Sequence, residues 1–97
     1  KVFFSVISCA EIACAVSRGR LKIKGHWKTW FNHYTTLNGW TPIEIDLAVI
    51  QEAYSLPEGY HADPADRIIT ASARLFNCSV ITADRKILEY PHVQSIW

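Results

Sequence analysis

Residues 61–86, HADPADRIITASARLFNCSVITADRK, decide the fold that this sequence predicts. The stretch opens with Asp63 and Pro64, residue types that are preferred at the cap and the first position of a helix. An apolar helix and a short buried strand follow, and Asp84 comes directly after that strand. If the helix packs on the strand, Asp66 and Asp84 lie at the same edge of a sheet, where two carboxylates can share a metal ion.

Strands and helices alternate along the rest of the chain, which has 97 residues and is long enough for one small domain. The predicted strands cover residues 2–7, 40–45, 79–82 and 93–96, and the predicted helices cover 8–18, 26–36, 46–55, 63–76 and 85–89. Pro42 suits an edge position in the second strand. The alternation predicts an α/β domain in which helices cover both faces of a mostly parallel sheet.

Three acidic residues occupy similar places beside strand ends and helix starts, namely Glu11, Asp66 and Asp84. In an open α/β sheet such positions lie outside the carboxyl ends of the strands, where ligands bind. Clustered carboxylates need a cation, because like charges destabilise one another. Hard oxygen ligands favour Mg²⁺ or Mn²⁺, which can activate water against a phosphoryl group.

Each of these carboxylates also has a structural interpretation that the sequence leaves open. Asp63 is explained by capping of the helix that follows it. Glu11 and Asp66 can complete capping boxes, Glu11 with Ser8 as its cap, and Asp84 can cap its own short helix. His61 precedes the Asp63 cap and could orient the loop.

Charge is distributed unevenly, although the net charge is only +1. Residues 12–43 contain no Asp or Glu but five basic side chains: Arg18, Arg20, Lys22, Lys24 and Lys28. This surface can hold a polyanion, and a solvated surface without a ligand explains it equally well. Arg67 and Arg85 lie beside predicted helix starts and are candidate phosphate contacts.

Aromatic residues recur with helical spacing in the helix predicted over residues 26–36: Trp27, Trp30, Phe31 and Tyr34. The simplest interpretation is that this face is core. A partner or dimer surface is the alternative, because so much aromatic area is large for a small domain.

The cysteines and the first residues of the chain indicate the cellular compartment of the protein. Three cysteines, Cys9, Cys14 and Cys78, without a Cys-x-x-Cys pair argue against a disulfide framework and favour a reducing cytoplasm. Glu11 interrupts the first apolar run, which argues against a signal peptide, and no run approaches the ~20 residues that span a bilayer. The chain contains no Met and begins at Lys1, so we expect it to be the C-terminal part of a longer protein.

Three segments together resemble the PIN domain, in the branch of VapC-type toxins. They are SVISCAEIA (5–13), HADPADRIITASA (61–73) and VITADRKI (80–87), in the order and spacing of that family. The resemblance covers nearly the whole chain and implies one domain with three α/β/α layers. It implies an Mg²⁺- or Mn²⁺-dependent ribonuclease whose catalytic, metal-binding residues are Glu11, Asp66 and Asp84. Residues with supporting roles would be Ser8, Asp63 and Thr82.

The resemblance also implies partners. These are an RNA substrate, an antitoxin protein that lays a segment across the active cleft, and commonly a second copy in a homodimer. The family's first strand, which carries the first catalytic Asp, is absent here, and it would lie centrally between the strands at 2–7 and 79–82. We therefore expect that part to come from further residues or a swapped partner, or this copy to be inactive.

The sequence thus predicts a PIN-like endoribonuclease, with residues 18–28 as an RNA path that includes Arg18 and Lys22. One alternative is an inactive or truncated PIN-like binding module that keeps only the interaction with its partner or antitoxin. Another is a hydrolase of small phosphate esters, for which no phosphate loop is recognisable. Cleavage of RNA with Mg²⁺ or Mn²⁺ separates the first two.

Overall fold

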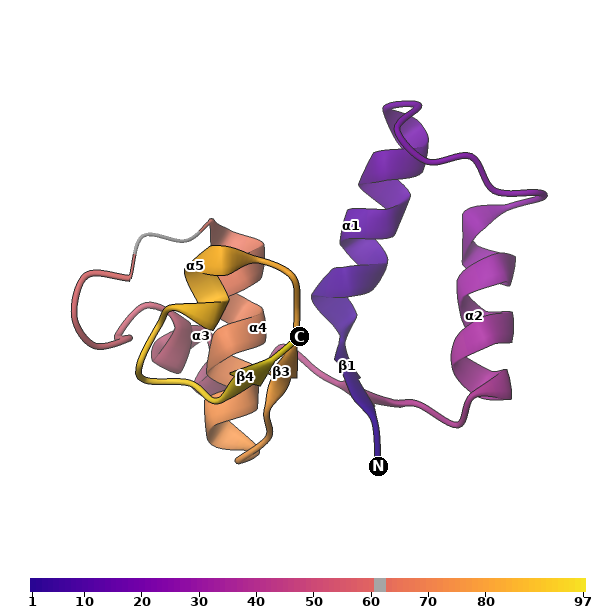
Figure 1. Ribbon diagram of the computed structural model, residues 1–97. Coiled ribbons are helices and arrows are strands. Elements are labelled where there is room, and N and C mark those ends of the chain that lie inside the picture. Colours follow the sequence, from indigo (N-terminus) through magenta and orange to yellow (C-terminus); the bar gives the residue numbers. More distant parts are fainter. Residues whose placement is uncertain (61–62) are drawn as a thin grey trace. The chain divides into compact units, whose positions relative to one another are not determined.

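The computed structural model describes residues 1–60 and 63–97 (Figure 1). His61, expected to orient the loop before a helix, lies outside the described residues. The chain divides into two compact units, which we call unit 1 (Lys1–Glu44) and unit 2 (Ile45–Trp97). Each unit contains its own pair of parallel strands.

Unit 1 is a parallel strand pair joined through two helices. Its elements are β1 (Phe3–Ser5), α1 (Val6–Ser17), α2 (Trp27–Leu37) and β2 (Thr41–Ile43). Phe3 lies opposite Thr41, and Ser5 lies opposite Ile43. Within the described residues β2 pairs only with β1, so Pro42 occupies an edge strand as expected.

Helix α1 begins earlier than the sequence predicted. Ser5, not Ser8, is its cap, because the Ser5 side chain accepts a hydrogen bond from the Ile7 amide at 3.2 Å. The predicted Ser8–Glu11 capping box is therefore wrong, and Glu11 lies in the second turn of the helix. Both serines are suitable caps, and pairing with β2 ends the strand at Ser5. Helix capping consequently does not explain Glu11.

Helix α2 begins where the sequence predicted it. His26 caps it, because its Nδ1 atom accepts a hydrogen bond from the Lys28 amide at 3.1 Å. Of the four aromatic residues predicted to share one face, only Phe31 is buried, packing edge-to-face on Phe4 of β1 with ring centroids 5.4 Å apart. Tyr34 is 44% exposed. The aromatic face is thus divided between core and surface.

Unit 2 carries the stretch from which the fold was predicted. Its elements are α3 (Leu47–Ala53), α4 (Pro64–Leu75), β3 (Val80–Ile81), α5 (Arg85–Leu88) and β4 (Ser95–Ile96). The predicted cap of α4 is confirmed, because Asp63 Oδ1 accepts from the Asp66 amide at 2.9 Å. Asp46, the first residue of the helix predicted over 46–55, caps α3 in the same way, with its Oδ1 accepting from the Val49 amide at 2.9 Å. After α4 the chain turns at Asn77, whose φ of 54° is a conformation that Asn tolerates.

The core of unit 2 ties the loop before α4 to the segments after it. Its buried members are Tyr60, Ala73, Val80, Ile87 and Tyr90. The rings of Tyr60 and Tyr90 stack with centroids 4.1 Å apart, and the Tyr60 and Thr70 hydroxyls are hydrogen-bonded at 3.1 Å. The Tyr90 hydroxyl donates to the Pro57 carbonyl at 2.6 Å. These contacts hold Pro57 and Tyr60 against Tyr90, and Tyr60 against Thr70 of α4.

The strands form two separate parallel pairs. In unit 2, Val80 lies opposite Ser95 and Ile81 opposite Ile96. No ladder joins β1 to β3 in the described parts of the chain. The predicted α/β class with parallel strands is confirmed.

Two further observations concern the chain as a whole. Cys9, Cys14 and Cys78 all carry free thiols. None of the helices within residues 1–60 and 63–97 has the length and apolar character needed to cross a membrane.

Candidate functional site

Asp66 and Asp84 of unit 2 act on the same phenol group. Asp66 stands in the first turn of α4, and Asp84 follows β3 and caps α5; both side chains are partly buried. Burial raises the pKa of Tyr60, the hydrogen bond with Thr70 lowers it, and the charges of Asp66 and Asp84 each raise it further. Both carboxylates therefore act electrostatically on one phenol. That they lie at one edge of a sheet and share a metal ion stays a prediction.

Asp84 is positioned by hydrogen bonds within its own turn. Its amide donates to Thr82 Oγ1 at 3.0 Å, and its Oδ1 accepts from the Lys86 amide at 2.8 Å. Thr82 thus supports this turn, and the capping interpretation of Asp84 is confirmed. A carboxylate offers about four lone-pair positions on two oxygens, so a cap can also serve as a metal ligand.

Asp63 acts on Asp66 through the backbone. Its side chain receives the Asp66 amide and so fixes the first turn of α4, on which the Asp66 carboxylate stands. Its capping role is confirmed. A role as an accessory acid stays a prediction.

Glu11 belongs to unit 1, where its side chain is exposed on α1. The predicted ligands are thus divided, with one in unit 1 and two in unit 2. Within either unit, the described residues form no group of three or more His, Cys, Asp or Glu side chains that could hold a metal. Glu11 as a ligand stays a prediction.

The chemistry of the unit 2 pair suits a hard cation. Mg²⁺ commonly binds through one or two carboxylates and completes its coordination with water and substrate phosphate oxygens. Asp66 and Asp84 supply carboxylate oxygen without the thiolate or imidazole that zinc prefers. The donor set therefore fits Mg²⁺ or Mn²⁺.

Arg67 has a structural role that the sequence analysis missed. Its guanidinium donates to the Tyr60 carbonyl at 2.8 Å and to the Ala53 carbonyl at 3.3 Å, and it lies 5.4 Å from the centre of the Tyr54 ring. It thereby braces the loop before α4, whose carbonyls need donors. The signal was an arginine one turn beyond a Pro/Gly loop. Its phosphate contact stays a prediction.

Arg85 is held more loosely. It pairs with Glu89 one turn along α5 at 2.9 Å, and both side chains are largely exposed. Exposed pairs of this kind contribute little, typically about 0.3–0.5 kcal/mol. A phosphate can therefore compete with Glu89 for Arg85.

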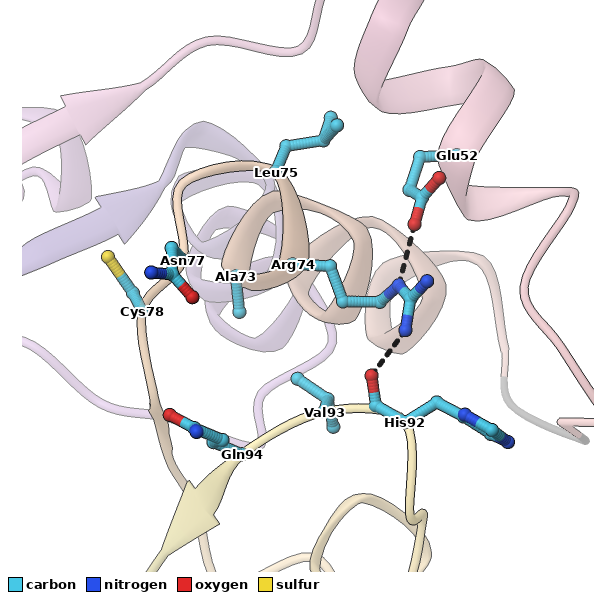
Figure 2. Close-up of a pocket in the computed structure, with 9 residues that line it drawn as sticks. All are labelled: Glu52, Ala73, Arg74, Leu75, Asn77, Cys78, His92, Val93 and Gln94. Carbon is cyan, nitrogen blue, oxygen red and sulfur yellow. Dashed lines mark hydrogen bonds and ion pairs between the residues drawn. The ribbon is translucent and has the colours of Figure 1, made fainter.

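A polar cavity of about 320 Å³ lies elsewhere in unit 2 (Figure 2). Arg74 Nε donates to Glu52 Oε2 at 2.6 Å, and another nitrogen of the same guanidinium donates to the His92 carbonyl. Cys78 and Gln94, which also line it, precede β3 and β4, so the cavity is at the amino ends of these strands. Arg74 thereby links α4 to α3 and to the segment before β4. The cavity is separate from Asp84, which follows the carboxyl end of β3.

The predicted RNA contacts Arg18 and Lys22 are both exposed residues of unit 1. Arg18 ends α1, where its amide donates to the Cys14 carbonyl at 3.0 Å. Lys22 lies in the segment between α1 and α2 and lines a groove. Both nucleic-acid roles stay predictions.

A tyrosine titration tests the electrostatic coupling within unit 2. Asp66→Asn and Asp84→Asn should each lower the Tyr60 pKa, because each removes a negative charge that opposes ionisation of the phenol. Ultraviolet absorbance of tyrosinate measures this, with Tyr60→Phe identifying the signal. Tyr90 is the internal control: burial raises its pKa too, but neither aspartate contributes.

The same shift fixes the sign of a pH effect on stability. The folded state holds the Tyr60 pKa above its usual value of 10.0, so the unfolded phenol ionises first. The stabilising contribution is complete below pH 10 and is lost as pH rises through the folded pKa. A Tyr60 pKa unmoved by both Asn variants would show that these carboxylates are not beside the ring.

The structure has α/β elements in which Asp84 follows the carboxyl end of β3 and Asp66 stands in the first turn of α4. Residues 1–93 match the family model of the PIN domain, so the chain belongs to the PIN domain family. This confirms the family that the three sequence segments indicated.

A solved structure has a similar fold. It is described as a toxin-antitoxin complex from Klebsiella pneumoniae, and its matched chain is 19% identical with a TM-score of 0.65. The match covers 96% of this chain and 70% of that one. Comparison with curated proteins gave no match.

Proposed function

We propose that this chain is a metal-dependent endoribonuclease of the VapC-type branch, which hydrolyses phosphodiester bonds of RNA. The observation that supports the proposal is that the charges of Asp66 and Asp84 both raise the pKa of Tyr60, in a chain of the PIN domain family. If these two partly buried carboxylates share a site, a bound cation would offset their mutual repulsion.

The two aspartates and Tyr60 of unit 2 have different roles in the proposed reaction. Asp66 and Asp84 would hold Mg²⁺ or Mn²⁺, with Glu11 as the proposed third carboxylate. The bound ion supplies an activated water and stabilises charge on the phosphoryl group. Tyr60 is protonated at neutral pH, since the ordinary tyrosine pKa of 10.0 is raised further here, so it adds no negative charge.

Phosphate recognition would come from basic side chains near the same turns. Arg85 follows Asp84 directly and can exchange its exposed partner Glu89 for a phosphate oxygen. The amino end of α4 adds a favourable field for an anion. Arg67 would contribute charge while it braces the loop.

A protein antitoxin is the partner that we propose for this chain, with a homodimer as its assembly. The support is the similar fold of a chain from a toxin-antitoxin complex. Three free thiols are in keeping with the reducing cytoplasm expected from the sequence.

Cleavage of a mixed-sequence RNA tests the proposal. We expect products with Mg²⁺ or Mn²⁺ and none with a chelator, because the proposed carboxylates act through the ion. Gel electrophoresis of an end-labelled RNA measures it. Binding of RNA or a protein partner without cleavage, for any divalent ion, would support the inactive binding module instead.

A further inference from the structure

Unit 1 has a groove along α2 that the carboxylate site does not use. One hollow of about 490 Å³ is lined by residues 21–26 together with Thr29, Trp30, His33 and Tyr34. A second hollow, of about 550 Å³, shares Thr29 and His33 with it and continues along the helix to Leu37. Figure 1 shows the connecting segment running from the end of α1 to the start of α2. The two hollows adjoin and form one open groove.

The groove is positively charged and contains no acid. Lys22 and Lys24 line it, and both side chains are exposed. No acidic side chain lines either hollow, and residues 12–43 contain none at all. The charge complement of this groove is therefore an anion.

Aromatic rings lie beside these lysines. Trp30 and Tyr34 are separated by 5.3 Å between ring centroids, and Tyr34 and His33 by 4.9 Å. Tyr34 is 44% exposed, although an aromatic side chain on a small domain is normally buried. His26 accepts a backbone hydrogen bond at Nδ1, so its neutral ring carries the proton on Nε2 and can donate from there.

We propose that Lys22, Lys24, Trp30 and Tyr34 form a binding subsite for single-stranded RNA. Bases stack on the exposed ring of Tyr34 and on the accessible part of the half-buried Trp30 ring, and the two lysines contact the phosphates. A cationic groove with stacking rings is the combination by which proteins hold single strands without reading their sequence. The inference rests on RNA as the proposed substrate and adds a binding surface outside the carboxylate site.

Two other occupants fit less well. Double-stranded RNA keeps its base faces within the helix, so it could use the lysines but not the rings. An acidic protein segment matches the charge, yet it gives the row of rings no planar partner. Both enter the experiment as competitors.

Binding without catalysis tests the subsite. Fluorescence anisotropy of a labelled 12-nucleotide RNA is measured on the whole chain in chelator, so that cleavage does not interfere. Tyr34→Leu should weaken binding about 5- to 150-fold, because one stacked base contributes about 1–3 kcal/mol. Tyr34→Phe keeps the ring and should retain most of the affinity.

Salt dependence tests the lysines separately. Lys22→Gln with Lys24→Gln should make the slope of log affinity against log salt shallower by about 1.4, since each phosphate contact to a single strand contributes about 0.7. Lys22→Arg with Lys24→Arg should restore the slope. Trp97→Leu, which changes an exposed aromatic residue outside the groove, should leave binding unchanged. Thermal unfolding checks that each variant is folded.

Three results would overturn the subsite: equal binding by wild type and Tyr34→Leu, equal affinity for duplex RNA, or displacement of the oligonucleotide by polyglutamate as readily as by unlabelled RNA. Metal-dependent cleavage together with any of these leaves the nuclease proposal in place. Ring-dependent RNA binding without cleavage supports the subsite and contradicts the nuclease.

Discussion

Asp66→Asn should lower metal-dependent RNA cleavage by about 100-fold or more. Substitution of a residue that only orients a metal ligand typically costs 10- to 100-fold, and a ligand should cost at least as much. The change keeps the size of the side chain, and the Asp66 amide still donates to the Asp63 cap, so α4 should fold normally. Initial cleavage rates at saturating Mn²⁺ and at limiting Mn²⁺ measure the effect.

Asp46→Asn is the matched control for this experiment. It makes the same chemical change at the cap of α3, where Asn accepts the Val49 amide as well as Asp does. Its cleavage rate should equal that of the wild type. Calorimetric titration with Mn²⁺ gives a second readout, in which Asp66→Asn should weaken binding and Asp46→Asn should not. Full activity and full Mn²⁺ affinity in Asp66→Asn would exclude it as a ligand.

Ile87→Ala should lower the free energy of unfolding by about 3 kcal/mol. Ile87 is 2% exposed and packs in the core of unit 2 with Tyr60 and Tyr90. Its truncation removes apolar contacts and leaves a cavity beneath α5. Small domains have only about 5–15 kcal/mol of stability, so the loss is a large share of the total. Urea unfolding followed by circular dichroism measures it.

Ile81→Ala provides the comparison at an exposed site. The same atoms are removed from β3, but Ile81 is 70% exposed, so the cost should stay below about 1 kcal/mol. Ile87→Ala should also reduce RNA cleavage, because α5 holds the turn that carries Asp84. Equal destabilisation by the two substitutions would show that α5 does not depend on the unit 2 core.

The caps of unit 2 and the course of its helices could be predicted from residue type and spacing. Asp46, Asp63 and Asp84 each cap a helix through an amide two or three residues along the chain. Such bonds depend only on local conformation, which the residues themselves favour. That Asp66 stands in the first turn of α4 and that Asp84 follows β3 directly was likewise predictable from residues 61–86.

Other features depend on residues that are distant in the sequence. Arg74 and Glu52 are 22 residues apart and Tyr90 bonds to a carbonyl 33 residues away, so no local pattern reveals these contacts. The hydrogen bonds that Arg67 donates likewise depend on the positions of two carbonyls, those of Ala53 and Tyr60, which only the folded structure sets. Polar groups at these separations in the sequence meet only because tertiary packing brings their elements together.

By itself the sequence indicated the α/β order and favoured the aspartate caps, because capping, strand propensity and apolar spacing are local properties. Its three motif segments resembled the PIN domain family, to which the chain belongs. Only the tertiary structure decided that Ser5 rather than Ser8 starts α1, because the register with β2 ends the strand there. It also separated Phe31 in the core from Tyr34 on the surface, although both fit one helical face. Burial depends on what packs against a helix, and helical spacing alone does not contain that information.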